Sequence, residues 1–253
     1  MKKYFSEQEM QNYHKDGFVI VRGMYSLPEI EEASSWIDGL IARPARVGKE
    51  MVYYEDSLLE KGKRILSRIE KFTDDHEGFY SLVREDHMIG RVSELLGEPA
   101  VLFKEKINFK LPGGAGFEPH QDIQPGWDDY ADFFISVLVT IDESTVQNGC
   151  LELASGHHQR GLIGQKWQPL QGKELEGIEF KEYPMKPGDV AFFDCFVPHQ
   201  SKPNLTNKQR RNLYLTYNRK SRGESREQYF SDKRKSFPPD HEREAGKEYK
   251  FRV

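Results

Sequence analysis

The sequence has few of the features that mark secreted, membrane-spanning or nucleic-acid-binding proteins. Only two of its 253 residues are cysteines, and the N-terminal stretch MKKYFSEQEM has no apolar run of the kind found in a secretory signal. No stretch approaches the roughly 18 apolar residues of a membrane span. Because 37 basic residues stand against 41 acidic ones, the net charge of −4 gives no electrostatic reason to expect nucleic acid as a partner. We therefore expect a reduced, cytoplasmic protein that binds a small molecule, with no nucleic-acid or membrane partner, and its oligomeric state stays open.

The chain is long enough to bury a sizeable core. With 37% hydrophobic and 12% aromatic residues, its 253 residues suit one large domain. We predict a single domain over residues 1–253. Within it we expect a helical N-terminal part that covers a sheet (1–99), a jelly-roll core (100–218) and a C-terminal tail (219–253).

Hydrophobic periodicity in the N-terminal part predicts helices around one short strand. Residues 6–17, 26–40 and 87–96 have helical spacing and end signals, and residues 18–21 form a short apolar run. Residues 43–70 are polar and weakly periodic, which favours a long loop. Whether that loop acts as a lid stays open.

From Ala100 onward, short β-rich runs follow one another with turn residues between them. The runs are VLFKEKINFK, FFISVLVTID, CLELAS, FKEYPMK, DVAFFDCFVP and NLYLTYNR. Runs at such close intervals indicate an antiparallel sandwich or barrel. We therefore predict a mainly β fold with flanking helices and a double-stranded β-helix, or cupin-like jelly roll, as its core. The tail after residue 218 is rich in charge but also in aromatics, so a solvated tail and a partly docked one are both open.

The stretch FEPHQDIQ at residues 117–124 carries the first candidate site. Residues two apart on a strand point to the same side, so His120 and Asp122 would face one point. They supply two thirds of the triad of two histidines and one carboxylate that binds Fe(II) and leaves positions open. The second histidine would be His199, which follows an apolar strand in FFDCFVPHQSKPN. Arg210 lies eleven residues further on, and its planar guanidinium suits a carboxylate.

This ordered set resembles the phytanoyl-CoA dioxygenase family of Fe(II)- and 2-oxoglutarate-dependent oxygenases. The resemblance covers almost the whole chain and rests on HKDGFVIVRGMYS, PHQDIQ, QNGCLELASGHH, KPGDVAFFD and HQSKPNLTNKQRR. It implies that His120, Asp122 and His199 bind Fe(II), and that 2-oxoglutarate and O2 are consumed. It also implies that Arg210 pairs with the distal carboxylate of 2-oxoglutarate, since the neighbouring Arg211 points to the opposite face of its strand.

Three further residues are candidates for binding the cosubstrate. The strand KEKINFK resembles the family strand that reaches 2-oxoglutarate, which suggests Asn108 and Lys104. Asn108 is the better candidate of the two. An ordinary strand surface is the alternative for both, and it explains Lys104 about as well as a binding role does. Ser201 could support the cosubstrate carboxylate or only make a turn hydrogen bond. Gly149 is expected to be structural, as a residue that allows positive φ.

The resemblance implies hydroxylation of an unactivated C–H bond, and we expect the substrate to be a small polar or amine-bearing molecule. Trp127 and Asp129, in PGWDDYADFF, would receive the amine through a ring face and a carboxylate, unless the segment is simply a solvated acidic loop. Desaturation or cyclisation stays open. The alternatives are a tailoring oxygenase of a larger secondary metabolite, a non-catalytic ligand-binding jelly roll, and a zinc or manganese cupin.

Overall fold

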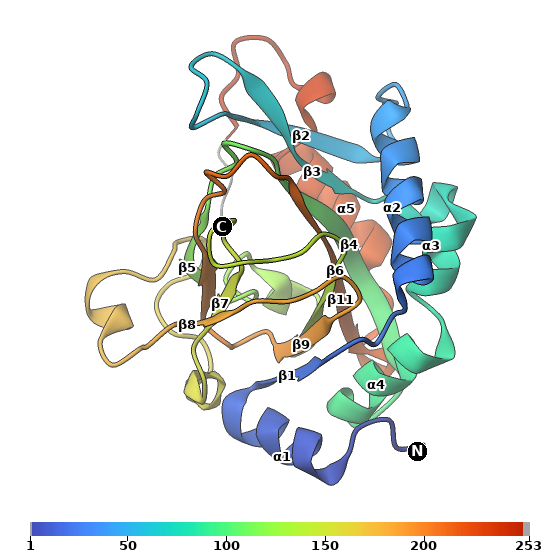
Figure 1. Cartoon of the computed structure of the whole chain (residues 1–253), viewed down its shortest axis with the longest axis vertical. Helices are drawn as coiled ribbons and strands as arrows, with labels where there is room; N and C mark the ends of the chain where they lie inside the picture. The colour runs from blue at the N-terminus through green and yellow to red at the C-terminus, as the bar shows by residue number, and fades with distance from the viewer. Residues whose placement is uncertain (1, 250–253) are drawn as a thin grey trace.

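Two antiparallel sheets that face each other form the core of the computed structural model, which describes residues 2–249 (Figure 1). The larger sheet contains, in spatial order, β1 (Phe18–Val21), β9 (Val190–Asp194), β6 (Phe134–Thr140), β11 (Arg210–Arg219), β4 (Ala100–Lys110), β3 (Arg64–Glu70) and β2 (Met51–Asp56). The smaller sheet contains β5 (Phe117–His120), β10 (His199–Ser201), β7 (Leu151–Leu153) and β8 (Lys181–Tyr183). The prediction of a jelly-roll fold with flanking helices is confirmed.

Helices pack on the outer face of the larger sheet. They are α1 (Glu7–Asp16), α2 (Leu27–Ala42), α3 (Glu77–Leu82) and α4 (Asp86–Leu96). Helix α5 (Arg226–Ser236) packs against β4 and reaches the inner side of the sheet, where the Tyr229 hydroxyl accepts a hydrogen bond from Lys104. Short 3-10 turns occur at Thr73–Asp75, Trp127–Asp129, His157–Arg160, Gly172–Leu175, Lys220–Arg222 and Asp240–Glu242. In α2, Ile30, Ala33 and Ile37 are buried at the spacing of one helix face, as the sequence predicted. This apolar face joins the same core cluster as Val137 and Leu213 of the sheet.

The two faces of the larger sheet differ in chemistry. Ile107, Leu213 and Leu215 belong to the apolar cluster beneath the helices. Side chains alternate across a strand, so the intervening positions face the smaller sheet. On β4 these positions carry Lys104, Lys106, Asn108 and Lys110. The space between the sheets is therefore lined by polar and cationic groups.

Residues 43–70 are not a loop, so that prediction is wrong. Strands β2 and β3 pair antiparallel, and β3 continues the larger sheet by pairing with β4. The hairpin escaped notice because its inward positions mix apolar Met51 and Tyr53 with charged Arg68 and Glu70, which hides the usual alternation of apolar and polar residues. Residues 1–99 thus contribute three strands as well as helical cover.

The C-terminal segment docks on the barrel. Helix α5 buries Tyr229 and Phe230 against aromatic residues near the end of the larger sheet, among them Phe103 and Trp127. The aromatic residues of this segment thus favoured the correct alternative, partial docking.

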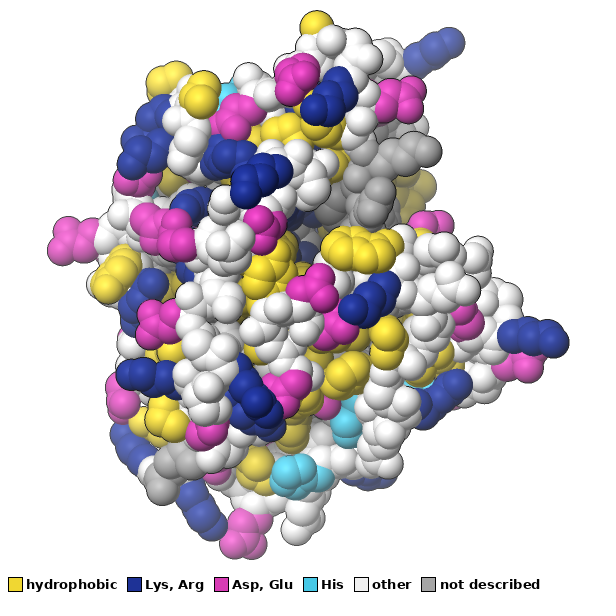
Figure 2. Space-filling model, turned by 180° about the vertical axis from the view of Figure 1, so that it is seen from behind, with side chains coloured by type: hydrophobic (Ala, Val, Ile, Leu, Met, Phe, Trp, Pro, Cys, Tyr) yellow, Lys and Arg dark blue, Asp and Glu magenta, His cyan; other side chains and the backbone are white. Residues whose placement is uncertain are grey.

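The molecular surface carries both signs of charge. On the face seen in Figure 2, basic and acidic side chains are interspersed. Among residues 2–249, no helix combines the length and apolar character that crossing a bilayer requires. Cys150 and Cys195 are buried free thiols.

Candidate active site

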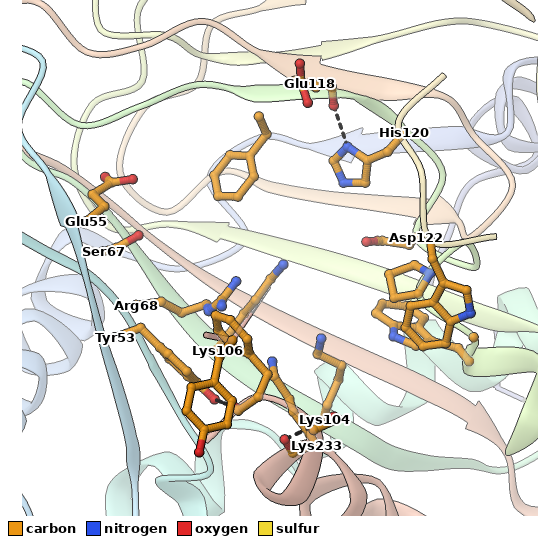
Figure 3. A pocket seen from close by; sticks show the side chains of 18 of the residues that line it. Tyr53, Glu55, Ser67, Arg68, Lys104, Lys106, Glu118, His120, Asp122 and Lys233 are labelled. Atoms are coloured by element: carbon orange, nitrogen blue, oxygen red, sulfur yellow. Dashed lines mark hydrogen bonds between the residues drawn. The ribbon is translucent and has the colours of Figure 1, made fainter. Parts of the chain in front are cut away.

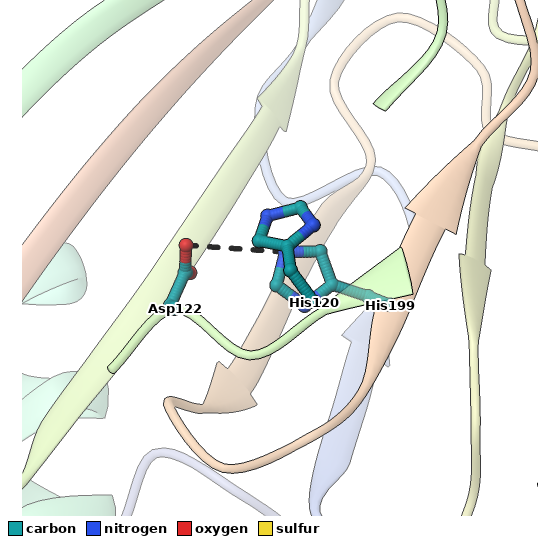
Figure 4. A group of neighbouring side chains, drawn as sticks. All are labelled: His120, Asp122 and His199. Atoms are coloured by element: carbon teal, nitrogen blue, oxygen red, sulfur yellow. Dashed lines mark ion pairs between the residues drawn. The ribbon is translucent and has the colours of Figure 1, made fainter. Parts of the chain in front are cut away.

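Two histidines meet where the short strands β5 and β10 pair. The antiparallel register aligns His120 with His199, and their ring centres lie 4.2 Å apart. Asp122 follows two residues after His120, just beyond the end of β5. One ligand atom from each of the three lies within 4.8 Å of the others (Figure 4). The structure therefore brings together the three residues that the sequence pattern singled out.

Backbone carbonyls orient both imidazole rings. His120 Nδ1 lies 2.7 Å from the carbonyl oxygen of Glu118, and His199 Nδ1 lies 3.0 Å from that of Val197. If Nδ1 donates in each case, Nε2 keeps its lone pair and is available to a metal. Burial is the main cause that lowers the pKa of both histidines, in the case of His120 to about 3. Both rings are therefore neutral at physiological pH, which is the form that binds a metal.

Asp122 is held as an anion beside them. Burial alone would raise its pKa, but the positive potential of His199, Lys106 and His120 and a hydrogen bond from the Ser136 hydroxyl to Oδ2 together lower it. Its Oδ1 lies 3.9 Å from His199 Nε2. The carboxylate thus has one oxygen engaged by Ser136 and the other turned toward the histidines.

Gln121, which lies between His120 and Asp122, fixes the turn that connects them. The side chain of Gln121 is fully buried, donates to the carbonyl oxygens of Gly161 and Phe196, and accepts a hydrogen bond from the Ile163 amide. Buried amides that are fully hydrogen-bonded make rigid anchors. The position of Asp122 relative to His120 is therefore set by the surrounding loops.

A pocket of about 1170 Å³ opens beside the three residues. Its lining includes His120 and Asp122, the inward residues of β3 and β4, and residues of α5 (Figure 3). Figure 3 shows several lysine and arginine side chains across the pocket from the two metal-ligand candidates. The volume slightly exceeds the usual range for small-molecule sites, so it can admit two small ligands together.

Arg210 and Arg211 have different surroundings, as the strand alternation predicted. Arg211 points toward the helices and bonds Asp142, Asp38 and Ser34. Arg210 faces the interior and is 2% exposed, and its Nε has no hydrogen-bond partner among the described residues. It is therefore the arginine with donor capacity left for a ligand.

Two of the predicted cosubstrate residues, Ser201 and Asn108, lie near Arg210. Lys110 pairs with it across β4 and β11, and Lys110 Nζ donates to the Ser201 hydroxyl at 2.7 Å. Burial, followed by the charge of Arg210, lowers the pKa of Lys110 to about 6. Asn108 lies one inward position further along β4, and its buried Oδ1 has no partner within the described chain. The lowered pKa of Lys110 leaves Arg210 as the cation at this level of the sheet.

The remaining predicted residues lie elsewhere in the pocket. Lys104 Nζ lies 4.7 Å from the centre of the Trp127 ring, so a cation of the protein already occupies one face of that indole. Asp129 is largely exposed and shares Lys166 with Asp128. The amine site at Trp127 and Asp129 stays a prediction. Lys104 lies over the Trp127 ring, and Lys166 lies beside Asp129.

Several pocket residues were missed from the sequence. Arg68, Glu70, Lys106, Lys233 and Tyr229 come from three separate segments and converge beside the metal-ligand candidates. The alternation of lysines in KEKINFK was the available signal, but it is equally typical of a solvated strand face.

Three comparisons place this geometry among known proteins. A family model described as phytanoyl-CoA dioxygenase matches residues 13–212. A 2-aminoethylphosphonate dioxygenase of the uncultured bacterium HF130_AEPn_1 is 39% identical over 248 residues, which are 97% of this chain and 94% of the relative. A methylphosphonate hydroxylase of Gimesia maris is 34% identical over 238 residues, or 94% of this chain and 90% of the relative. Among solved structures, EctD from S. alaskensis with 2-oxoglutarate and 5-hydroxyectoine matches with a TM-score of 0.75, covering 87% of this chain and 78% of that one at 22% identity, a likeness in fold.

Proposed function

This chain belongs to the phytanoyl-CoA dioxygenase family, and we propose that it is an Fe(II)- and 2-oxoglutarate-dependent dioxygenase that hydroxylates an unactivated C–H bond of a small polar molecule. The observation that carries the proposal is the convergence of His120, Asp122 and His199 at one edge of a large pocket. Family membership argues against a non-catalytic binding module.

The donor set fits Fe(II). Two neutral imidazole nitrogens and one carboxylate oxygen form the facial triad found in non-haem iron oxygenases, which leaves positions for cosubstrate and oxygen. We assign His120, Asp122 and His199 as the ligands. When bound, the iron supplies the oxidising chemistry, in which 2-oxoglutarate becomes succinate and carbon dioxide while one oxygen atom of O2 enters the substrate. Ser136 keeps the ligand carboxylate oriented, and the Glu118 and Val197 carbonyls keep both rings aimed at the metal.

We assign Arg210 to the distal carboxylate of 2-oxoglutarate. Its guanidinium is buried, and the Asn212 amide, oriented with its oxygen toward Arg210, accepts a hydrogen bond from Nη1 at 2.5 Å. Lys110, bonded to Ser201, lies beside it. A carboxylate here accepts charge-assisted hydrogen bonds from the buried guanidinium. Asn108 is the remaining candidate along the same face.

The substrate is proposed to be a small phosphonate or a compound of similar size and polarity. Two relatives that match over nine tenths of their length are named for phosphonates. The cationic lining of the pocket suits an anionic molecule better than a hydrophobic scaffold. Whether the product is a hydroxylated, desaturated or cyclised compound is decided by product analysis.

The test is an anaerobic titration of metal-free protein with Fe(II) and 2-oxoglutarate, followed by the visible charge-transfer absorption of the chelated complex. Wild type should develop the band, and His199→Ala should not, while both keep the same far-UV circular dichroism. Lys15→Met, an exposed change on α1, serves as the control and should behave as wild type. Absence of the band in wild type would refute the assignment. Succinate release in air, with and without candidate substrates, then identifies the substrate.

A further inference from the structure

A second group of basic side chains lines the pocket beyond those assigned to the cosubstrate. Arg68 comes from β3, Lys104 and Lys106 from β4, and Lys233 from α5 (Figure 3). One carboxylate, Glu70, lies among them. Glu70 forms an ion pair with Arg68 Nε at 2.8 Å and accepts a hydrogen bond from Lys233 Nζ at 2.7 Å. Two of the four basic groups thus share this acid, and we call the four residues and Glu70 the basic cluster.

Lys104 and Lys106 have no carboxylate within ion-pair distance among residues 2–249. Lys104 Nζ donates to the Tyr229 hydroxyl at 3.0 Å and lies over the Trp127 ring. Lys106 Nζ lies 5.0 Å from the centre of the Tyr214 ring. Buried charges are normally paired, because leaving water is costly for an ion. Burial, followed by the charge of Lys104, lowers the pKa of Lys106 to about 7, and burial lowers that of Lys104 as well.

The strand register places Lys104 at a different level of the larger sheet from Arg210. Lys104 aligns with Thr216 and, through it, with Ser136, which bonds the metal-ligand candidate Asp122. Strand β11 lies between β6 and β4, so Ser136 and Lys104 are two strand spacings apart, about 10 Å. Arg210 instead lies six residues along β11 from Thr216, about 20 Å at the usual rise per residue. Lys104 and Arg210 therefore lie in different directions from the metal-ligand candidates, one across the sheet and one along it. Arg68 aligns with Asn108 and, through it, with Asn212, which is two residues from Arg210 on β11.

We propose that the basic cluster binds the tetrahedral, doubly charged head group of a phosphonate or phosphate monoester, with Lys104 and Lys106 as its principal ligands. This inference rests on the proposed function and names the substrate class of that site. Donors from several directions, two ammonium groups together with Arg68 and the Tyr229 hydroxyl, suit an ion with three terminal oxygens. Glu70 engages Arg68 and Lys233 and so fixes the base of the cluster, while the two lysines on β4 remain for the ligand.

The same geometry predicts how the substrate is oriented in the pocket. The head group would sit at the β3–β4 side, below Trp127 and Tyr229, and the carbon chain would extend toward Asp122 and His120. A cationic end group has no place in the basic cluster, where four basic groups repel it. An amine on the substrate would therefore point away from Lys104 and Lys106.

The experiment measures anion binding on the assembled site. Protein loaded anaerobically with Fe(II) and 2-oxoglutarate is titrated by calorimetry with methylphosphonate, methyl phosphate and propionate, for wild type, Lys104→Met and Lys106→Met. Methionine keeps the length of the side chain, and removal of a lysine without a carboxylate partner leaves no acid unpaired. The matched control is Lys15→Met on the exposed face of α1.

We expect wild type and the control to bind at least one of the two tetrahedral dianions more tightly than propionate. Each β4 variant should lose about tenfold to a hundredfold of that affinity, the range for one charge-assisted hydrogen bond. The ratio of methylphosphonate to methyl phosphate affinity names the source of the head group. All variants should keep the charge-transfer band, which reports the iron and 2-oxoglutarate separately.

Three results would overturn the inference. Wild type that forms the band but binds neither dianion has no such head-group site. Variants that bind both dianions as wild type does would show that Lys104 and Lys106 are not ligands. Variants that lose 2-oxoglutarate affinity instead would assign the lysines to the cosubstrate. Loss of the band in wild type is a different failure, that of the proposed function itself.

Discussion

Glu70 offers a sharp test of the electrostatics of the pocket. Its side chain is fully buried, with Lys233 and Arg68 bonded to its oxygens. Burial alone would raise the pKa of Glu70, but the charges of Lys233, Arg68 and Lys104 outweigh it and lower the pKa from 4.5 to about 2. We predict that Glu70→Gln destabilises the protein, because the change removes the carboxylate that pairs with Lys233 and Arg68.

The size of the effect follows from that shift. A lowering from 4.5 to about 2 corresponds to about 3 kcal/mol of stability that the ionised carboxylate contributes at neutral pH. This agrees with the usual cost of about 3–5 kcal/mol for breaking a buried ion pair by removing one partner. Because the folded-state pKa of Glu70 is depressed, the contribution is complete above pH 4.5 and is lost as pH falls toward 2. At pH 3.5 roughly 1 to 1.5 kcal/mol of it should already be gone.

Urea unfolding at pH 7 and at pH 3.5 measures both quantities. The gap in unfolding free energy between wild type and Glu70→Gln should be about 3 kcal/mol at pH 7 and visibly smaller at pH 3.5. Glu60→Gln is the control, since Glu60 pairs with Lys63 on the exposed turn of the same hairpin, where an ion pair contributes at most about 1 kcal/mol. Adding Lys233→Met to Glu70→Gln should restore part of the loss by removing an unpaired cation. A gap below about 0.5 kcal/mol at pH 7 would refute the reasoning.

Three further predictions concern the metal, the cosubstrate and the turn behind them. Asp122→Ala should abolish Fe(II) binding, measured by equilibrium dialysis, and leave the melting temperature within a few degrees of wild type. Arg210→Ala should raise the KM for 2-oxoglutarate at least about tenfold, from the loss of a charge-assisted bidentate contact, whereas Arg211→Ala should lower the melting temperature and leave that KM unchanged. Gly149→Ala should cost more than about 1 kcal/mol in urea unfolding, because Gly149 has φ +74° and an added Cβ would lie 2.0 Å from the Lys202 carbonyl oxygen.

Local sequence patterns were sufficient where the structure depends on neighbours along the chain. The spacing of His120 and Asp122 predicted that they converge, although Asp122 lies in the turn after β5, and the helix that starts after Ser26 shows its buried face in its own spacing. His199 could be predicted because it follows an apolar strand closely in the sequence. Its alignment with His120 follows from the pairing of β5 with β10.

The basic cluster could not be predicted from the sequence, and the reason is physical. Alternation in KEKINFK separates two faces of a strand, but it does not say which face is buried, and lysines normally mark the solvated one. Here the lysine face is the interior face, supported by Glu70 from β3 and Tyr229 from α5, which are distant in sequence. The same inversion made the β2–β3 hairpin look like a polar loop.

The position of the two cationic groups bears on how one pocket distinguishes two anions. Arg210 and Lys110 are both almost fully buried, at a level of the sheet where Asn108 and Asn212 supply further polar atoms. A planar carboxylate needs no more than such a paired donor set. Lys104 and Lys106 lie instead beside aromatic rings, those of Trp127 and Tyr214. Because about 20 Å of strand separates Lys104 from the level of Arg210, a single 2-oxoglutarate cannot bridge these two residues. On the proposed assignments, Lys104 therefore stays available to an anionic substrate while Arg210 binds the cosubstrate.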